Sequence, residues 1–257
     1  MKISKRLHKV TKMAAPGTFA VDVGCDHGYT AITLVEEGIC TGAVASDVRE
    51  GPLRAADANI RRAGLSGRIR TVLADGIPQS PESYLPEDVP ALLIVTGMGG
   101  QLILRILREA GSGLARFSEM LLGPQSDIPL VRRELPALGF SIADEQMVEE
   151  DGKYYVLIKA RRRDPRSEKT VSGRFSEPDG AFEGFPEEPS EALCLAFGRP
   201  LLLRKDPVLA GFLRRRCGIL QKIEDELLAG GQAETGRMAE VREEKLLTEK
   251  ARLYVES

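Results

Sequence analysis

The sequence predicts an α/β fold in which a mostly parallel sheet carries helices on both faces and finishes with an antiparallel hairpin. Two observations lead to this class. Strand-like and helix-like segments alternate over roughly the first 160 residues. After that alternation, two strand-like runs follow each other with only the turn sequence EEDGK between them. Alternation predicts parallel strands joined by crossover helices, whereas a short turn can join only antiparallel strands.

The expected parallel strands are short apolar runs flanked by Gly, Asp or Pro, as in a sheet that is buried on both faces. They cover residues 18–24, 42–47, 69–74, 91–97 and 119–125. The helices expected between them cover residues 28–37, 50–63, 101–110 and 128–138. Each of the last three is followed directly by a glycine, the residue that most often follows a helix.

The hairpin is expected from residues 140–148 and 154–160, which flank Asp151-Gly152. Asp-Gly is a strong hairpin signal, because both central residues of the favoured tight turn need a positive φ. A parallel sheet that ends in such a hairpin is a poor match to a six-stranded dinucleotide dehydrogenase. It matches the Rossmann-like seven-stranded sheet of class I S-adenosylmethionine-dependent methyltransferases.

Composition sets limits on the class of protein. The chain has 257 residues, 42% hydrophobic and 29% charged, and a formal net charge of −2, so any surface for nucleic acid must come from local clustering. The four cysteines form no C-x-x-C pair, which disfavours a disulfide framework or a zinc knuckle. No apolar stretch approaches the roughly 20 residues of a membrane helix. A cytoplasmic, metal-free protein is expected.

The last third of the chain has a different character. Residues 164–190 are rich in Pro, Gly, Ser and charge and predict a flexible linker between a methyltransferase-type domain (1–163) and a helical hairpin (191–257). Helices are expected at 207–229 and 233–255, joined by Gly230-Gly231 and packed in coiled-coil fashion. The expected apolar stripes are Val208, Phe212, Ile219, Ile223 and Leu227 on the first helix, and Met238, Val241, Leu246 and Leu253 on the second.

The segment DVGCDHGY (22–29) joins the first strand to the first crossover helix and is the leading candidate for a cofactor loop. Gly24 permits a sharp turn and a close ligand, but the dinucleotide fingerprint G-x-G-x-x-G is absent. Asp26 stands where its second glycine would be, and a carboxylate there repels a diphosphate. A cationic cofactor such as S-adenosylmethionine is favoured instead. Two alternatives remain open: Asp26 as a helix N-cap and His27 as a structural histidine.

Three acids mark successive strand ends, where open α/β sheets bind ligands. Asp22 is a candidate acceptor for loop amides or the cofactor ammonium group. Asp47 is well placed for the two ribose hydroxyls of a nucleoside, and Asp75-Gly76 for an adenine amino group. Any one of these could be a simple turn acid, but the ordered set is far more specific.

The acceptor side is expected after the fourth strand, in the sequence VTGMGGQ (95–101). Gly97, Met98, Gly99 and Gly100 precede a helix N-terminus and would let a planar base lie against bare backbone. A tight turn without function is the alternative. Gln125 and Asp127, after the next strand, are further polar candidates.

In these motifs the sequence resembles the bacterial tRNA adenine-N1-methyltransferases of the TrmK type, which modify adenine 22. The similarity lies in SKRL (4–7), DVGCDHGY (22–29), D-x-x-x-GPL (47–53), ADG (74–76), GMGG (97–100) and EEDGKYY (149–155). The resemblance implies a class I methyltransferase domain with a helical C-terminal extension, S-adenosylmethionine as methyl donor and tRNA as substrate. Many relatives have Ser and Ala where this chain has Cys25 and Gly28.

The chemistry adds expected roles. Neutral adenine N1 needs no deprotonation before it attacks a sulfonium methyl group, so catalysis rests on positioning and on stabilising positive charge. Asp26 suits that task, with His27 and Tyr29 as further catalytic candidates; Tyr29 could equally serve helix–sheet packing. Lys5 and Arg6 are expected to contact RNA phosphates. They belong to one basic N-terminal cluster with Lys2, Lys9 and Lys12, and the other candidate clusters are Arg161 to Arg163 and Arg214 to Arg216.

The sequence indicates the methyl donor more specifically than the methyl acceptor. A class I methyltransferase acting on another RNA or a small molecule, or a non-catalytic RNA-binding module of the same fold, are the alternatives. A monomer is expected.

Overall fold

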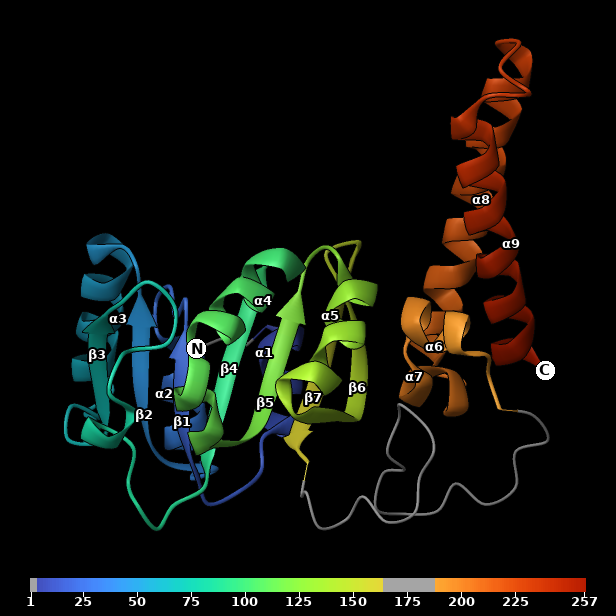
Figure 1. Ribbon diagram of the computed structural model, residues 1–257. Helices are drawn as coiled ribbons and strands as arrows, with labels where there is room; N and C mark the ends of the chain where they lie inside the picture. Colours follow the sequence, from blue (N-terminus) through green and yellow to red (C-terminus); the bar gives the residue numbers. More distant parts are fainter. Residues whose placement is uncertain (1–3, 164–187) are drawn as a thin grey trace. The chain divides into compact units, whose positions relative to one another are not determined.

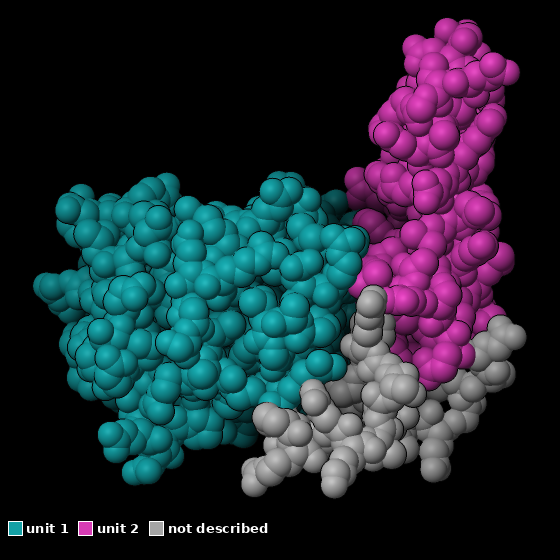
Figure 2. All heavy atoms as spheres, in the orientation of Figure 1, with its two compact units in different colours: residues 1–179 teal, residues 180–257 magenta. Residues whose placement is uncertain are grey.

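The computed structural model describes residues 4–163 and 188–257. The chain divides into two compact units, Met1–Asp179 and Gly180–Ser257, which are coloured separately in Figure 2. Residues 164–187 of the expected flexible linker lie outside the described residues, as does Lys2. Within the described ranges, no helix combines the length and the apolar character needed to cross a membrane.

The first unit is built on a seven-stranded sheet with the order β3-β2-β1-β4-β5-β7-β6. All neighbouring strands are parallel except β7, which pairs antiparallel with both β5 and β6. The strands are β1 (Thr18–Val23), β2 (Cys40–Asp47), β3 (Ile69–Leu73), β4 (Ala91–Met98), β5 (Phe117–Pro124), β6 (Phe140–Glu150) and β7 (Lys153–Arg162). The expected class I methyltransferase fold is confirmed.

Helices cover both faces of this sheet (Figure 1). One face carries α1 (Lys5–Met13), α2 (Tyr29–Glu36) and α3 (Glu50–Arg62); the other carries α4 (Gly100–Glu109) and α5 (Ile128–Glu134). Short 3-10 helices are η1 (Pro81–Ser83), η2 (Gly111–Arg116) and η3 (Leu135–Leu138). The helix expected over 128–138 changes to η3 at Leu135, because Pro136 removes a backbone donor.

Helix α1 was not expected from the sequence, where residues 5–13 were interpreted only as a basic segment. Ser4 is its N-cap, and its hydroxyl accepts a hydrogen bond from the Leu7 N–H at 3.1 Å. Val10 and Met13 are buried against the domain. The apolar face of α1 therefore joins the core between the sheet and α2, and its polar residues stay outside.

The strand order creates a topological switch point between β1 and β4. From β1 the chain moves outward through β2 to β3, and then returns to β4 on the other side of β1. The connections that leave β1 and β4 consequently cover opposite faces of the sheet, which opens a crevice at the carboxyl ends of these strands.

The second unit contains four helices within the described residues: α6 (Glu191–Phe197), α7 (Arg199–Leu203), α8 (Pro207–Ala229) and α9 (Gly236–Glu256). The expected hairpin of α8 and α9 is present, with Gly230 and Gly231 in the turn. The second helix starts at Gly236 because Thr235 caps it, accepting from the Met238 N–H at 3.2 Å. Helices α6 and α7 were not expected.

The predicted apolar stripes of the hairpin were partly wrong. Met238 and Val241 are buried, but Leu246 and Leu253 are exposed, and the inner face of α9 continues instead through Thr248, Ala251 and Val255. On α8 the buried positions are Leu209, Ala210, Leu213 and Leu220, and Ile219 is exposed. The docking of α6 and α7 against α9 changes which face of the hairpin is covered, and helical periodicity alone cannot report this.

Candidate active site

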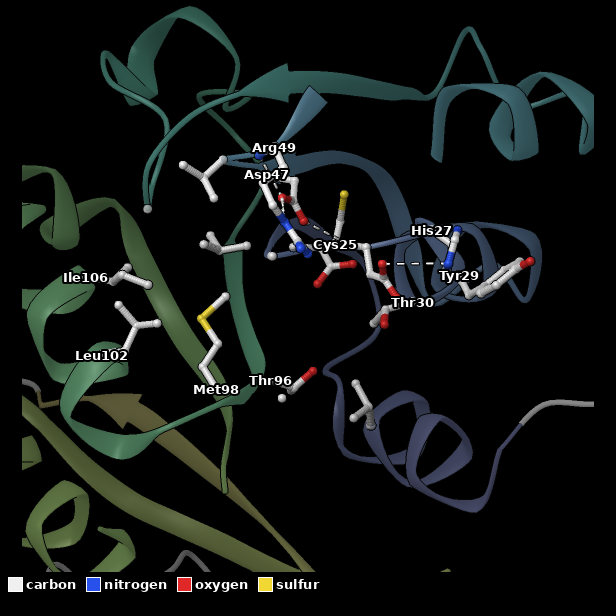
Figure 3. Close-up of a pocket in the computed structure, with 18 of the residues that line it drawn as sticks. Cys25, His27, Tyr29, Thr30, Asp47, Arg49, Thr96, Met98, Leu102 and Ile106 are labelled. Carbon is white, nitrogen blue, oxygen red and sulfur yellow. Dashed lines mark hydrogen bonds and ion pairs between the residues drawn. The ribbon is translucent and has the colours of Figure 1, made fainter. Parts of the chain in front are cut away.

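A cavity of about 600 Å³ lies at the carboxyl ends of β1, β2 and β4. Figure 3 shows its two sides: Cys25, His27 and Asp47 face Met98, Leu102 and Ile106 across it. Helix α1 also contributes to the lining. The cavity therefore occupies the crevice expected at the switch point.

The loop between β1 and α2 wraps tightly around the cavity. Gly24, Asp26 and Gly28 all have positive φ, at 71°, 51° and 73°. A side chain on Gly24 would collide with the Met98 side chain. The N–H groups of Gly24 and Cys25 each donate to the Ser46 carbonyl at 2.9 Å, which fixes the loop to β2. Glycine at position 24 is thus favoured by the positive φ of the turn, and a larger residue would also displace the end of the Met98 side chain.

Asp26 does not cap α2. The N-cap residue is Gly28, and no side chain caps the helix, so the capping alternative is wrong. The Asp26 side chain is 67% exposed, lines the cavity and lies 3.7 Å from Nε2 of His27. The His27 backbone carbonyl accepts from Asn59 Nδ2 at 3.0 Å, which helps to hold this part of the loop. A carboxylate and an imidazole are thereby presented together at the cavity.

Asp47 links the loop to the end of β2. Its Oδ1 accepts from the Arg49 N–H at 2.9 Å, and its Oδ2 accepts from the Asp26 N–H at 3.4 Å. The Arg49 guanidinium Nε lies 3.8 Å from the same carboxylate. Asp47 is nearly buried, yet it lines the cavity. Its orientation is therefore set by two backbone donors, which leaves the remaining lone pairs free to accept from a bound group.

Asp22 is a buried carboxylate at the same place. It is 3% exposed, it lines the cavity, and its Oδ2 has no hydrogen-bond partner within the described parts of the chain. Burial raises the pKa of Asp22 to about 7; the Ala31 N–H lowers it, and the nearby Asp47 raises it further. A positively charged group beside Oδ2 would relieve this desolvation. Burial likewise raises the pKa of the Cys25 thiol, which stays neutral.

Asp75 and Gly76 lie on the far side of the cavity, after β3. Asp75 Oδ1 accepts from Arg105 Nη2 at 3.2 Å, and Arg105 also approaches Glu109 at 4.0 Å. Both Asp75 and Arg105 are at least half exposed, so this ion pair orients the carboxylate more than it stabilises the fold.

The expected acceptor residues divide into two groups. Gly97, Met98 and Gln125 line the cavity, with the Gln125 N–H donating to the Met98 carbonyl at 2.8 Å. Gly99 and Gly100 do not line it. A side chain on Gly100 would overlap the Ser126 carbonyl at 2.6 Å, so Gly100 allows α4 to pack against the turn after β5. Asp127 begins α5 outside the lining, where its carboxylate accepts from Ser126 Oγ at 2.7 Å.

Tyr29 is 40% exposed and lines the cavity, and its ring centroid lies 5.8 Å from that of His27. The alternative that Tyr29 packs between helix and sheet is therefore wrong. The exposed ring is available to a planar group, and it points away from Met98 in Figure 3.

The two expected phosphate-binding residues of α1 differ in position. Arg6 lines the cavity, and its guanidinium carbon lies 5.2 Å from the centroid of the Tyr155 ring. Lys5 is directed elsewhere: its N–H donates to Glu150 Oε1 at 2.6 Å and its ammonium to the Glu149 carbonyl at 3.4 Å. Arg6 alone is brought to the cavity.

Sequence patterns missed several lining residues. They are Ser4, Leu7, Val10, Thr30, Arg49, Thr96, Leu102, Arg105 and Ile106. Most belong to helix faces, and only the packing of α1 and α4 determines which face points inward. The one available signal was position: Thr96 belongs to the fourth strand end and Arg49 follows Asp47 by two residues.

The arginines of the two other basic clusters mostly form hydrogen bonds and ion pairs with other residues of the protein. Arg162 donates through Nε to the Phe117 carbonyl at 3.0 Å and stacks on Phe140, while Arg161 contacts Glu119. In the second unit, Arg214 pairs with Glu256 at 2.9 Å, and Arg216 pairs with Glu244. These pairs join α8 to α9.

Comparison with known proteins agrees with this geometry. The family described as "Methyltransferase domain" matches residues 3–158. The tRNA (adenine(22)-N(1))-methyltransferase of Bacillus subtilis is 29% identical over 164 residues, 64% of this chain and 67% of that protein. A putative tRNA methyltransferase of Mycoplasma pneumoniae is 34% identical over 137 residues, 53% of this chain; the match spans only 60% of that relative's length.

Among solved structures, a putative tRNA (m1A22) methyltransferase of Streptococcus pneumoniae, in complex with S-adenosyl-L-methionine, superposes with a TM-score of 0.75. It is 27% identical, and the match covers 97% of this chain and 99% of that one. The chain belongs to the methyltransferase domain family. Within that class, the expected resemblance to the TrmK-type tRNA adenine-N1-methyltransferases is confirmed by the Bacillus and Streptococcus relatives.

Proposed function

We propose that this protein methylates N1 of adenine 22 in tRNA, with S-adenosylmethionine as the methyl donor. The observation that carries the proposal is the set of four carboxylates, Asp22, Asp26, Asp47 and Asp75, around one cavity at the strand ends. The relatives supply the acceptor, since the Bacillus subtilis protein is a tRNA (adenine(22)-N(1))-methyltransferase.

The cavity residues fit S-adenosylmethionine. Asp22 offers a buried carboxylate oxygen with no partner among the described residues, which suits the donor's ammonium group. Gly24 has no side chain to project into the cavity, and its positive φ turns the backbone toward it. Asp47 would accept from the ribose hydroxyls, and Asp75 with Gly76 would face the adenine amino group. The absence of a glycine at position 26 disfavours a diphosphate cofactor, as the sequence indicated.

S-adenosylmethionine supplies an electrophilic methyl group when bound. Adenine N1 would attack that methyl group with its in-plane lone pair; as the N–C bond formed, the methyl–sulfur bond would break, the donor would leave as a neutral thioether, and the positive charge would pass to the base. Asp26, exposed at the cavity, would stabilise that charge. The Asp26 carboxylate and His27 Nε2, 3.7 Å apart, form a pair that could take the N6 proton that the methylated base then releases.

The acceptor base would enter the cavity beside the Gly97-Met98 turn, with the exposed Tyr29 ring at the outer edge of the cavity. A base in a folded tRNA must leave its stack to reach such a pocket. Tyr29 offers a π-face that replaces the lost stacking, and Gln125 offers an amide for the base edge. Arg6, held against Tyr155, would contact the adjoining phosphate.

The domain organisation, oligomeric state and location of the protein are proposed as well. We propose that residues 1–163 form the catalytic domain and residues 191–257 a separate helical domain, and that the protein acts as a monomer in the cytoplasm. Gly99, Gly100 and Lys5, which were expected to bind substrate, support the site indirectly through packing at α4 and α1.

The test is methyl transfer from labelled S-adenosylmethionine to an unmodified tRNA transcript, with the modified base mapped. A matched transcript in which adenine 22 is replaced by guanine is the control. Label at N1 of adenine 22, and none in the control transcript, is the expected result. Label in another RNA position, or only in a small-molecule acceptor, would assign the protein to another branch of the family.

A further inference from the structure

A second hollow, of about 530 Å³, lies on the other side of α1, against the β6–β7 hairpin. Its positively charged lining comes from two elements, with Lys9 and Lys12 on α1 and Lys159 and Arg161 on β7. We call these four residues the basic groove. Asp144 and Gln146 of β6 complete the polar lining.

The basic groove carries more positive charge than its acids neutralise. Four cationic side chains line it, against one lining carboxylate, Asp144. Glu119, behind the groove, contacts Lys159 Nζ at 3.0 Å and Arg161 Nε at 3.3 Å. Even with both acids counted, two positive charges remain, in a chain whose formal net charge is −2. The excess is local, which is typical of a surface that binds anions.

The four cationic side chains differ in the hydrogen bonds and ion pairs that they already form within the protein. Lys159 is nearly buried and also donates to the Met13 carbonyl at 2.6 Å, so it mainly anchors α1. Lys9 donates to a neutral partner, Gln146 Oε1, at 3.2 Å. Lys12 is exposed, and within the described chain no side-chain hydrogen bond or ion pair involves it. Lys9, Lys12 and the outer nitrogens of Arg161 are therefore available to a ligand.

Helix α1 is the wall shared by the groove and the candidate active site. Ser4, Arg6, Leu7 and Val10 line the active-site cavity, whereas His8, Lys9, Lys12 and Met13 line the groove. At 100° per residue the two sets are centred on opposite sides of the helix, with Arg6 and Lys9 about 60° apart at one border between them. A helix with its side chains is about 10–12 Å across. A stacked strand at about 3.4 Å per nucleotide covers that distance in roughly three nucleotides.

We propose that the basic groove binds phosphates of the RNA strand that flanks the methylated base, within about three nucleotides of it. The proposal rests on the proposed function, because that function places a base in the cavity on the other side of α1. Arg6 faces the cavity and Lys9 and Lys12 face the groove, so one strand crossing α1 would meet cations on both sides. Lysines recognise phosphates as point charges and without sequence preference.

The test is equilibrium binding of an unmodified tRNA transcript over about 50–200 mM salt, for the full chain and the double variant Lys9→Gln/Lys12→Gln. Each lost phosphate contact should lower the slope of log K against log salt by about 0.7–0.9, so roughly 1.5 for the two. We expect roughly tenfold weaker binding, with unchanged melting temperature and unchanged S-adenosylmethionine affinity. Arg62→Gln is the matched control, since it removes one exposed charge with a neutral partner, Asn59, from α3.

Each outcome is decisive. A double variant whose salt slope and affinity equal those of Arg62→Gln would overturn the proposal while leaving the methyltransferase assignment intact. If the wild-type protein does not methylate tRNA but its RNA binding depends on both lysines, the proposed function is overturned. The assignment of the basic groove as an RNA-binding site then stands. Loss of binding to a polyglutamate peptide, with tRNA affinity unchanged, would assign the groove to an acidic protein segment and overturn the proposal.

Discussion

The two hollows on either side of α1 differ in charge and in how the chain builds them. Four carboxylates at strand ends and in the β1–α2 loop line the active-site cavity beside three arginines, and backbone donors hold Asp47 in place. Lysines and an arginine from one helix face and one strand face surround the basic groove. A cationic donor and a polyanionic acceptor require opposite surroundings, and the thickness of a single helix separates the two.

The largest effect is expected from the Asp26 carboxylate. Asp26→Ala should lower kcat by about 10²–10³, because it removes the charge proposed to stabilise the cationic product. The side chain is exposed and does not cap α2, but Ala is less favourable than Asp at a φ of 51°, so the fold should persist with a loss of about 1 kcal/mol. Single-turnover kinetics and a melting curve measure both, and Asp57→Ala on α3 is a control carboxylate. Near-normal turnover would remove Asp26 from the mechanism.

A substitution in the donor site should weaken S-adenosylmethionine binding with little effect on tRNA binding. Asp47→Asn should weaken S-adenosylmethionine binding by roughly 10–100-fold, because two charge-assisted hydrogen bonds to the ribose become neutral ones. Calorimetry measures the donor, and the salt-dependent tRNA assay measures the acceptor. The comparison predicts that tRNA affinity changes less than about twofold, the reverse of the Lys9→Gln/Lys12→Gln result. Parallel losses in both assays would mean that the two hollows act as one site.

Asp22 should make donor binding depend on pH. Its pKa is raised from 3.8 to about 7, so the folded protein holds a proton that the unfolded chain has already released between those values. Stability of the ligand-free protein should therefore fall as pH rises through that window, and donor affinity should rise roughly tenfold from about pH 6 to about pH 8. Asp22→Asn should flatten both profiles. A pH dependence that survives the substitution would point to another group.

The smallest effect is expected at Arg105. It orients Asp75 through one ion pair between exposed groups, and such pairs contribute little. Arg105→Gln should raise the Kd for S-adenosylmethionine by about 2–5-fold and leave the single-turnover rate at saturating donor unchanged. Arg54→Gln, which breaks a comparable exposed pair with Glu50, is the control. A changed rate at saturation would show that Arg105 also acts during transfer.

Sequence patterns predicted the structure best where the backbone conformation depends on only a few neighbouring residues. Gly24 and the Asp151-Gly152 turn have the positive φ that their positions require, and the strand ends at Asp22, Asp47 and Asp75 meet at one cavity because parallel strands end at the same edge. The patterns were weakest on helices. The basic segment at 5–13 was not recognised as α1, and the apolar stripes of α8 and α9 were partly assigned to the wrong faces.

The role of the GMGG turn could be predicted from the sequence only in part. Its glycines predicted a close approach of backbone, and the close approach exists. At Gly97 the turn faces the cavity, but at Gly100 it faces the Ser126 carbonyl. A glycine signals that space is short without saying what fills it, so the residues that touch the acceptor could not be separated from those that pack α4.

The amino-acid sequence by itself determined the α/β architecture, the antiparallel ending and the row of acids at the strand ends, because strand periodicity and turn chemistry act over a few residues. Only the tertiary structure decided that α1 stands between the active-site cavity and the basic groove, that Arg6 lines the first and Lys12 the second, and that Arg105 reaches Asp75. Those facts depend on how a helix is rotated against the sheet. That rotation is set by contacts between residues far apart in the chain, such as the hydrogen bond from the Lys159 ammonium to the Met13 carbonyl.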